Sequence, residues 1–231
     1  MPYVPPEYLK TIVLLGNINH NRRICPLGTG FLVQVKKEGY SRFWLVTAAH
    51  VVKDDMSYFF MGKDRKINRI SFEALKEKLG VEWHIFQDDF AIINVGFDLE
   101  AHDIKLIQSD MIFSRERLFP GEDVFFLGYP LGFIEDNDIT PFIRMGIIAR
   151  MYDNKNRFII DGYSTGGSSG SPLFIHSKIF SRHGQSRSMP QLIGMIQGHI
   201  PHPNHPDENT NLALALSVEK IHSEIMNLNQ A

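Results

Sequence analysis

Three short segments of this chain carry residue types that together can transfer an acyl group. Leu45–Val52 is an apolar run that ends in small residues and a histidine, and Asp88–Val95 opens with two aspartates before an apolar run. Ser164–Phe174 places several serines among glycines. A histidine can act as a base, an aspartate at a strand end can orient it, and a serine flanked by free backbone N–H groups can attack a carbonyl carbon. These segments therefore predict a nucleophile, a base, an orienting acid and an oxyanion hole.

The elements that would position these segments are mostly short apolar runs separated by Gly, Pro, Asn or Asp. Several runs alternate with period two and are rich in Val, Ile, Phe and Leu, which is typical of strands. The expected strands are Thr11–Leu15, Thr29–Val35, Arg42–Thr47, Met56–Met61, Phe90–Val95, Asp123–Tyr129, Phe142–Met151, Arg157–Asp161, Pro172–Ile175, Leu192–His199 and Asn211–Leu216. Only Phe72–Leu79 and Ser217–Asn227 indicate helices, the second capped by Ser217. Many strands with few helices favour an all-β barrel or sandwich.

The three segments follow one another in the order histidine, aspartate, serine, which is the order of the chymotrypsin fold. All three resemble those of trypsin-like serine peptidases, and the closest resemblance is to the HtrA/DegP-type peptidase domain, which lacks disulfides. Thr29–Val33 resembles the strand before that family's histidine, and Gly121–Gly132 resembles the opening strand of its second barrel with the following turn. Met145–Ile148 and Leu192–Met195 also fit. The resemblance covers nearly the whole chain.

The resemblance implies a role for each reactive residue. Ser169 would attack the scissile carbonyl, and His50 would take its proton and then donate it to the leaving amine. Asp89 would hold the imidazole in the required tautomer and stabilise its charged form. The backbone N–H groups of Gly167 and Ser169 would form the oxyanion hole, where glycine allows a close approach of the backbone.

Two neighbouring residues compete for these roles. Asp88 precedes Asp89, but Asp89 lies immediately before the apolar strand and matches the family register. Ser168 is the central serine of Gly166–Gly170, which satisfies the G-x-S-x-G nucleophile elbow of a different fold. That elbow requires a helix directly after the serine, whereas the residues from Pro172 onward predict a strand, so we favour Ser169.

The resemblance also implies the domain organisation, namely two antiparallel six-stranded β-barrels of the chymotrypsin type with a C-terminal helix. A polar segment at 114–122 separates the two strand-rich halves of the chain. We therefore expect residues 1–113 to form a barrel that carries His50 and Asp89. Residues 114–231 would form a second barrel that carries Ser169 and ends in the helix.

The pocket for the substrate residue before the scissile bond can be placed only by the resemblance. Tyr163 would lie at its base, and Ile196, Gly198 and His199 would line its wall. Because no acidic residue occupies the base, a buried Arg or Lys of the substrate would lack a partner. We therefore expect a preference for an uncharged, small-to-medium apolar residue.

Two further features have simpler interpretations than a functional site. His199, His202 and His205 are spaced like ligands, but the interleaved prolines favour an irregular loop and no acidic or thiol ligand has a recognised spacing. We expect loop histidines beside the cleft, with no metal and no cofactor. Cys25 is the only cysteine and precedes Pro26 in an expected turn, so an intramolecular disulfide is impossible.

The composition excludes several classes of partner. The 231 residues include 24 Lys plus Arg against 26 Asp plus Glu, a formal charge of −2. This balance provides no general attraction to nucleic acid or acidic membranes. No segment has the pattern of a signal peptide or the ~20 apolar residues of a membrane span. We expect a cytoplasmic protein with no nucleic-acid or membrane partner.

The function indicated most strongly is a serine endopeptidase that cleaves protein or peptide substrates through an acyl-enzyme intermediate. One alternative is an acyl hydrolase such as an esterase, because the triad does not determine the leaving group. Another is a latent or inactive peptidase fold that binds peptides or regulates another protein, since the Gly- and Ser-rich segment around Ser168 can rearrange. A regulatory partner or a second copy of the chain would then order the site. We expect no PDZ domain.

Overall fold

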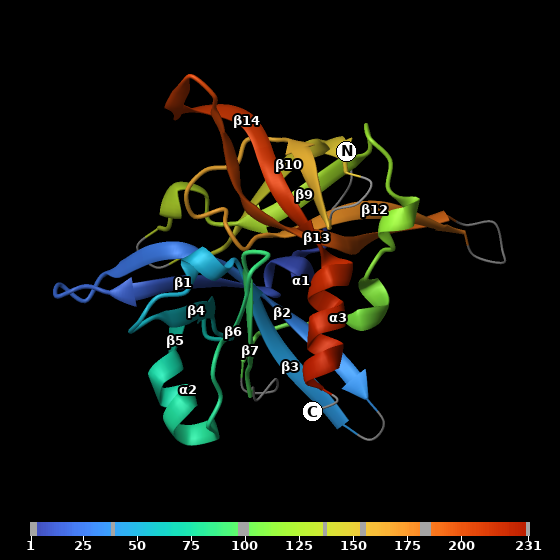
Figure 1. Ribbon diagram of the computed structural model, residues 1–231. Helices are drawn as coiled ribbons and strands as arrows, with labels where there is room; N and C mark the ends of the chain where they lie inside the picture. The colour runs from blue at the N-terminus through green and yellow to red at the C-terminus, as the bar shows by residue number, and fades with distance from the viewer. Residues whose placement is uncertain are drawn as a thin grey trace.

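The N-terminal half of the chain folds into one eight-stranded sheet (Figure 1). The computed structural model describes residues 4–37, 40–96, 102–135, 138–152, 156–180 and 186–229. The strand order is β5-β4-β1-β2-β3-β7-β6, and the short β8 pairs in parallel with β2. The strands are β1 (Ile12–Ile18), β2 (Ile24–Lys37), β3 (Tyr40–Thr47), β4 (Ser57–Met61), β5 (Ile67–Ser71), β6 (His84–Phe86), β7 (Phe90–Asn94) and β8 (Ile107–Gln108).

The C-terminal half forms a closed antiparallel barrel of six strands in the order β10-β11-β14-β13-β12-β9. Its strands are β9 (Asp123–Gly128), β10 (Phe142–Met151), β11 (Arg157–Asp161), β12 (Pro172–Phe180), β13 (Ser186–His202) and β14 (His205–Ser217). The predicted all-β, chymotrypsin-like class is confirmed. The N-terminal sheet has eight strands where the resemblance implied six. Its β5, β6 and β8 were not among the expected strands, and β6 and β8 are only three and two residues long, too short to show a period in the sequence.

Both predicted helices are confirmed, and each starts at a serine cap. In α2 (Phe72–Leu79) the Ser71 hydroxyl accepts a hydrogen bond from the Ala74 N–H, and in α3 (Val218–Leu228) the Ser217 hydroxyl accepts one from the Glu219 N–H. A one-turn helix, α1 (Pro6–Leu9), was not predicted. Four 3₁₀ turns complete the structure: η1 (Ala49–Val51), η2 (Ser109–Met111), η3 (Arg115–Arg117) and η4 (Pro130–Gly132). In the described ranges, no helix is long and apolar enough to cross a membrane.

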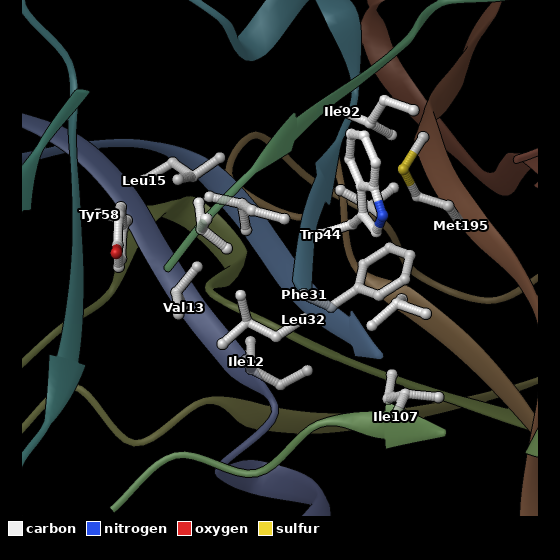
Figure 2. Close-up of a cluster of buried hydrophobic side chains, with 14 of the residues drawn as sticks. Ile12, Val13, Leu15, Phe31, Leu32, Trp44, Tyr58, Ile92, Ile107 and Met195 are labelled. Atoms are coloured by element: carbon white, nitrogen blue, oxygen red, sulfur yellow. The ribbon is translucent and has the colours of Figure 1, made fainter. Parts of the chain in front are cut away.

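The larger hydrophobic core joins the two halves of the chain. Phe31 and Trp44 of the N-terminal sheet belong to the same buried cluster as Phe174 and Met195 of the barrel. Figure 2 shows Met195 among side chains of the N-terminal strands. A second, smaller cluster fills the barrel interior and includes Phe158. The two sheets are therefore held together by a shared core as well as by the chain connection.

The C-terminal helix α3 is part of this joint core. Its Val218, Ile221 and Ile225 side chains are buried in the larger cluster, together with residues of β1, β2 and β3. The Arg42 guanidinium of β3 also donates a hydrogen bond to the Asn229 side chain just after α3. Helix α3 thus belongs to the core that both halves share, and a hydrogen bond joins its C-terminal end to β3.

Two expectations about irregular segments are wrong. His202 and His205 lie in a long β13–β14 hairpin rather than an irregular loop, because shifts in the strand register accommodate Pro201. Cys25 lies within β2 opposite Asn17 rather than in a turn, and its thiol is exposed. Among the described residues, no group of three or more His, Cys, Asp or Glu side chains could hold a metal ion.

Replacing Ile225 with alanine should lower the free energy of unfolding by about 2–4 kcal/mol, because it opens a cavity in the core that the two halves share. Urea unfolding followed by circular dichroism measures this change. Ser223, exposed on the same helix, supplies the control: Ser223→Ala should change the stability by less than about 0.5 kcal/mol. Equal unfolding midpoints for the two variants would contradict the packing role of α3.

Candidate active site

The structure brings the three predicted reactive residues into one hydrogen-bonded chain. His50 lies in η1 directly after β3, Asp89 in the turn between β6 and β7, and Ser169 in the segment between β11 and β12. The His50 Nδ1 atom is 3.0 Å from each oxygen of the Asp89 carboxylate. The His50 Nε2 atom is 3.0 Å from the Ser169 hydroxyl oxygen. A base is therefore placed between a hydroxyl group and a carboxylate.

The tight β6–β7 turn positions Asp89. Phe86 and Phe90 pair across the turn with stacked rings whose centroids are 4.3 Å apart, and the Asp89 N–H donates to the Phe86 carbonyl. Asp89 has a left-handed backbone with φ of 58°, which aspartate tolerates better than most residues. Its carboxylate also accepts a hydrogen bond from the His50 backbone N–H. In contrast, the Asp88 carboxylate lies within 4 Å of the cations of Arg157 and Lys220.

The surroundings of Asp89 favour its charged form. Burial raises the pKa of the carboxyl group, but hydrogen bonds from the His50 ring and backbone lower it, as do the charges of His50 and Arg157. The lowering contributions prevail, so the pKa of Asp89 lies below its usual value. An ionised Asp89 can accept the Nδ1–H of the imidazole, which leaves Nε2 as the acceptor that faces Ser169.

Gln197 of β13 is a site residue that the sequence did not reveal. Its side chain is buried, and the amide Nε2 donates to the backbone carbonyls of both Asp88 and Asp89. Its own backbone carbonyl lies 3.0 Å from the Ser169 hydroxyl. One residue of the barrel thus supports the aspartate turn of the other half and also contacts the serine. Its place as one of two polar residues, with His199, in the otherwise apolar 192–200 stretch was its only sign in the sequence.

Hydrogen bonds fix the orientation of the peptide units around Gly167. The Ser168 N–H donates to the Thr165 carbonyl and closes a turn, in which Gly167 has φ of 86°. The Gly166 carbonyl accepts a hydrogen bond of 2.6 Å from the Leu131 N–H of η4. Because the C=O and N–H of a trans peptide point in opposite directions, this bond turns the Gly167 N–H away from η4. In the described part of the chain, no group accepts the N–H of Gly167 or of Ser169.

Ser168 has no access to a substrate. It is only 1 % exposed, and its hydroxyl accepts a hydrogen bond from the Thr165 N–H. The next regular element is the strand β12, which begins at Pro172, and not a helix. Both observations argue against the nucleophile-elbow alternative and leave Ser169 as the serine beside the imidazole.

Thr29 of β2 anchors the nucleophile segment from the opposite half of the molecule. Its hydroxyl donates to the Gly167 carbonyl at 2.8 Å and accepts from the Tyr129 N–H at 3.1 Å. Its backbone N–H donates to the Ser169 carbonyl at 2.9 Å, and its carbonyl accepts from the Thr47 hydroxyl at 2.7 Å. Thr29 is fully buried, so water cannot replace these bonds.

The predicted pocket residues are not all where the resemblance placed them. Tyr163 is 44 % exposed, with its ring beneath the Arg144 guanidinium, so it does not form a buried pocket base. The Ile196 side chain is fully buried in the barrel core and does not reach the surface. Gly198 and His199 follow Gln197 on β13 and are accessible at this side of the site. Only these two of the four remain candidates for contacting a substrate.

Comparisons with known proteins agree with this fold. Residues 28–178 match the family described as trypsin-like peptidase domain, and the chain therefore belongs to that family. No curated protein matches the sequence. Solved structures of a serine-to-alanine variant of the HtrA-type protease AlgW, one with a tripeptide and one with a decapeptide, are similar in fold. Their TM-scores are 0.56 and 0.55, at 16 % and 15 % identity over 95 % and 97 % of this chain. The chain spans 60 % and 66 % of their length.

Gly170 allows the nucleophile segment to approach β2, and an alanine there should be strongly destabilising. Its φ is 87°, and a Cβ would lie 1.9 Å from the Thr29 carbonyl oxygen. We expect Gly170→Ala to lower the free energy of unfolding by more than about 3 kcal/mol in urea titrations, since strain and overlap add.

Gly121 provides the matched control for this substitution. It has a similar φ of 93°, but a Cβ at this position would have no atom within 4 Å. Gly121→Ala should therefore cost only the ~1–2 kcal/mol of the left-handed backbone. Equal losses of unfolding free energy in the two variants would show that the close approach of Gly170 to Thr29 does not contribute to stability.

Proposed function

We propose that this protein is a serine endopeptidase that cleaves peptide bonds through the triad Ser169, His50 and Asp89. The observation that carries this proposal is the continuous hydrogen-bonded chain, with 3.0 Å from the Ser169 hydroxyl to His50 and 3.0 Å from His50 to Asp89. These are the distances at which an imidazole can remove a proton from a nucleophile.

In the first half of the reaction the Ser169 oxygen attacks the carbonyl carbon of the substrate while His50 Nε2 takes the hydroxyl proton. The tetrahedral oxyanion accepts hydrogen bonds from the N–H groups of Gly167 and Ser169. One such donor typically contributes about 3–4 kcal/mol to transition-state stabilisation. His50 then donates its proton to the leaving amine, and the C–N bond breaks to give an acyl-enzyme. Asp89 stabilises the positively charged imidazole during this step.

In the second half a water molecule takes the place of the leaving amine. His50 removes a proton from this water, whose oxygen attacks the acyl carbon, and the same two N–H groups hold the new oxyanion. Collapse of the intermediate returns the proton from His50 to Ser169 and releases the carboxylic acid.

An assembled site is favoured over a latent one. The Gly166 carbonyl is bonded to Leu131 and the Gly167 carbonyl to Thr29, so both peptide units beside the oxyanion hole are held by neighbouring elements. Peptides as substrates are supported by the AlgW structures, one of which holds a tripeptide and the other a decapeptide. The second candidate is an esterase that uses the same site. Failure of the protein to cleave any peptide would favour the esterase over the peptidase.

The nucleophile can be tested by covalent labelling with a fluorophosphonate probe. We expect wild-type protein to be labelled and Ser169→Ala to be unlabelled, with peptide cleavage reduced by at least about 10³-fold. Ser168→Ala is the control and should keep most of the labelling, because its hydroxyl is buried away from His50. Loss of labelling in Ser168→Ala alone would contradict the assignment, and labelling only after addition of peptide would indicate a latent site.

We expect cleavage after uncharged, small-to-medium apolar residues. The two residues that remain candidates for contacting this side chain, Gly198 and His199, offer no carboxylate to pair with a buried Arg or Lys. Digestion of a proteome-derived peptide library, read by mass spectrometry, measures this preference. Dominant cleavage after Arg or Lys would show that a carboxylate reaches the pocket.

A further inference from the structure

A cavity of about 560 Å³ beside the β1–β2 hairpin is not used by the proposed chemistry. Its floor consists of five apolar side chains from β1, β2, β4, β5 and the segment after η4, among them Ile24 and Ile134. Arg22, Arg23 and Arg69 complete the lining together with one acidic residue of the described chain, Glu135. Three positive charges against one negative charge leave a surplus of two.

These arginines have free hydrogen-bonding capacity. In the ranges that the structure describes, none of the three forms an ion pair with Glu135 or any other acidic side chain. Arg69 is held in place because its Nε donates a hydrogen bond of 2.9 Å to the hydroxyl of the buried Ser57. Its two terminal nitrogens remain for a ligand. A fixed guanidinium binds a carboxylate through two parallel hydrogen bonds, so the cavity is suited to an acidic group.

Strand β2 leads from the nucleophile to this cavity. Gly28 lies beside the nucleophile, since a Cβ added there would be 3.2 Å from the Ser169 carbonyl oxygen. Pro26 lies beside η4, since a Cβ added at Gly132 would meet the proline ring. Ile24, four residues before Gly28 in the same strand, lines the cavity. At a rise of about 3.3 Å per residue, the cavity lies about 13 Å from the nucleophile segment.

One edge of β2 carries no paired strand of the described chain over 24–28, and beyond this stretch Thr29 bonds the Ser169 carbonyl and the Thr47 hydroxyl. Over 24–28 the strand pairs with β1 on one edge, whereas its pairing with β3 begins only at Phe31. In the described part of the chain no strand pairs with the other edge between these points. An extended peptide can run beside such an edge, and its third to fifth residue from Ser169 would then reach the cavity.

The leaving-group half of a substrate faces β2 and not β13. His50 must donate its proton to the leaving amine, so that amine lies on the imidazole side of Ser169. The next residue of η1, Val51, packs against Gly28: a Cβ on Gly28 would lie 2.7 Å from its methyl carbons. The acyl half lies on the other side, where Gln197 contacts the serine and is followed by Gly198 and His199.

We propose that the cavity binds acidic side chains of the substrate at the third to fifth positions after the scissile bond. This inference rests on the proposed endopeptidase function and names a feature of its substrates. Arg22, Arg23 and Arg69 are specificity-determining residues that bind the carboxylate, while the apolar floor accommodates the carbon chain of the same side chain. The contribution is electrostatic and should weaken as salt is added.

The proteome-derived peptide library provides the first test. Wild-type protein should cleave sites with Asp or Glu at these positions about three- to tenfold more often than sites with Asn or Gln. The double variant Arg22→Gln/Arg23→Gln should lose this preference, and Arg23→Glu should shift it towards Lys and Arg. Both residues are exposed on a hairpin, so the variants should fold normally. Arg65→Gln, an exposed arginine outside the cavity, is the matched control and should keep the preference.

A binding measurement separates this inference from the proposed function. The inactive Ser169→Ala protein should bind a fluorescein-labelled Ala-Ala-Ala-Glu-Glu-Glu-amide at least about threefold tighter than the Gln counterpart by fluorescence anisotropy. The double arginine variant in the same background should abolish the difference. If no peptide is cleaved but this arginine-dependent binding remains, the endopeptidase proposal fails while the acidic site stands.

Three outcomes would overturn the inference while leaving an active peptidase in place. The first is cleavage with no preference for acidic residues after the scissile bond, and the second is a preference that lies only before that bond. The third is equal binding of the Gln peptide once its terminal amide is replaced by a free carboxylate, which would assign the cavity to a chain terminus rather than to side chains.

Discussion

The functional geometry depends on the buried hydrogen bonds of Thr29. Through them β2 holds two carbonyls of the nucleophile segment, while the same hydroxyl accepts the Tyr129 N–H that leads into η4. Each partner is a buried polar group, and leaving one unpaired typically costs about 1–3 kcal/mol. Because these groups belong to both halves of the chain, the geometry of the proposed oxyanion hole depends on how the two halves are docked.

This junction explains why the site lies between the two sheets. His50 and Asp89 come from the N-terminal half, and Ser169 and Gln197 come from the barrel, so the hydrogen bond between His50 and Ser169 forms only when the halves meet. The shared hydrophobic core, to which α3 also contributes, supplies the non-directional part of this association. The buried polar groups determine how the two halves are oriented, since their hydrogen bonds form in only one relative orientation of the halves.

Strand β2 connects the proposed catalytic site to the cavity proposed to bind acidic side chains. Its middle anchors the nucleophile segment, and its first residues border the arginine-lined cavity. If both proposals hold, the strand sets the separation between the two, and binding of a distant acidic residue would help to orient the scissile bond. Binding energy far from the reacting atoms can in this way contribute to positioning at the reacting centre.

Sequence alone determined the elements and residues whose identity follows from local pattern. The strand density, the capping serines and the positions of His50, Asp89 and Ser169 within their segments all appear within a few residues of chain. Tertiary structure decided the role of Gln197, the exposure of Tyr163 and the burial of Ile196. Gln197 depends on residues more than a hundred positions away, and the other two depend on which side of the chain faces the core. The arginine cavity is of the same kind: Arg22 and Arg69 carry no distinguishing pattern in the sequence and meet only because β1, β4 and β5 lie side by side in one sheet. Contacts of this range are set by packing of the whole chain, and local periodicity carries no information about them.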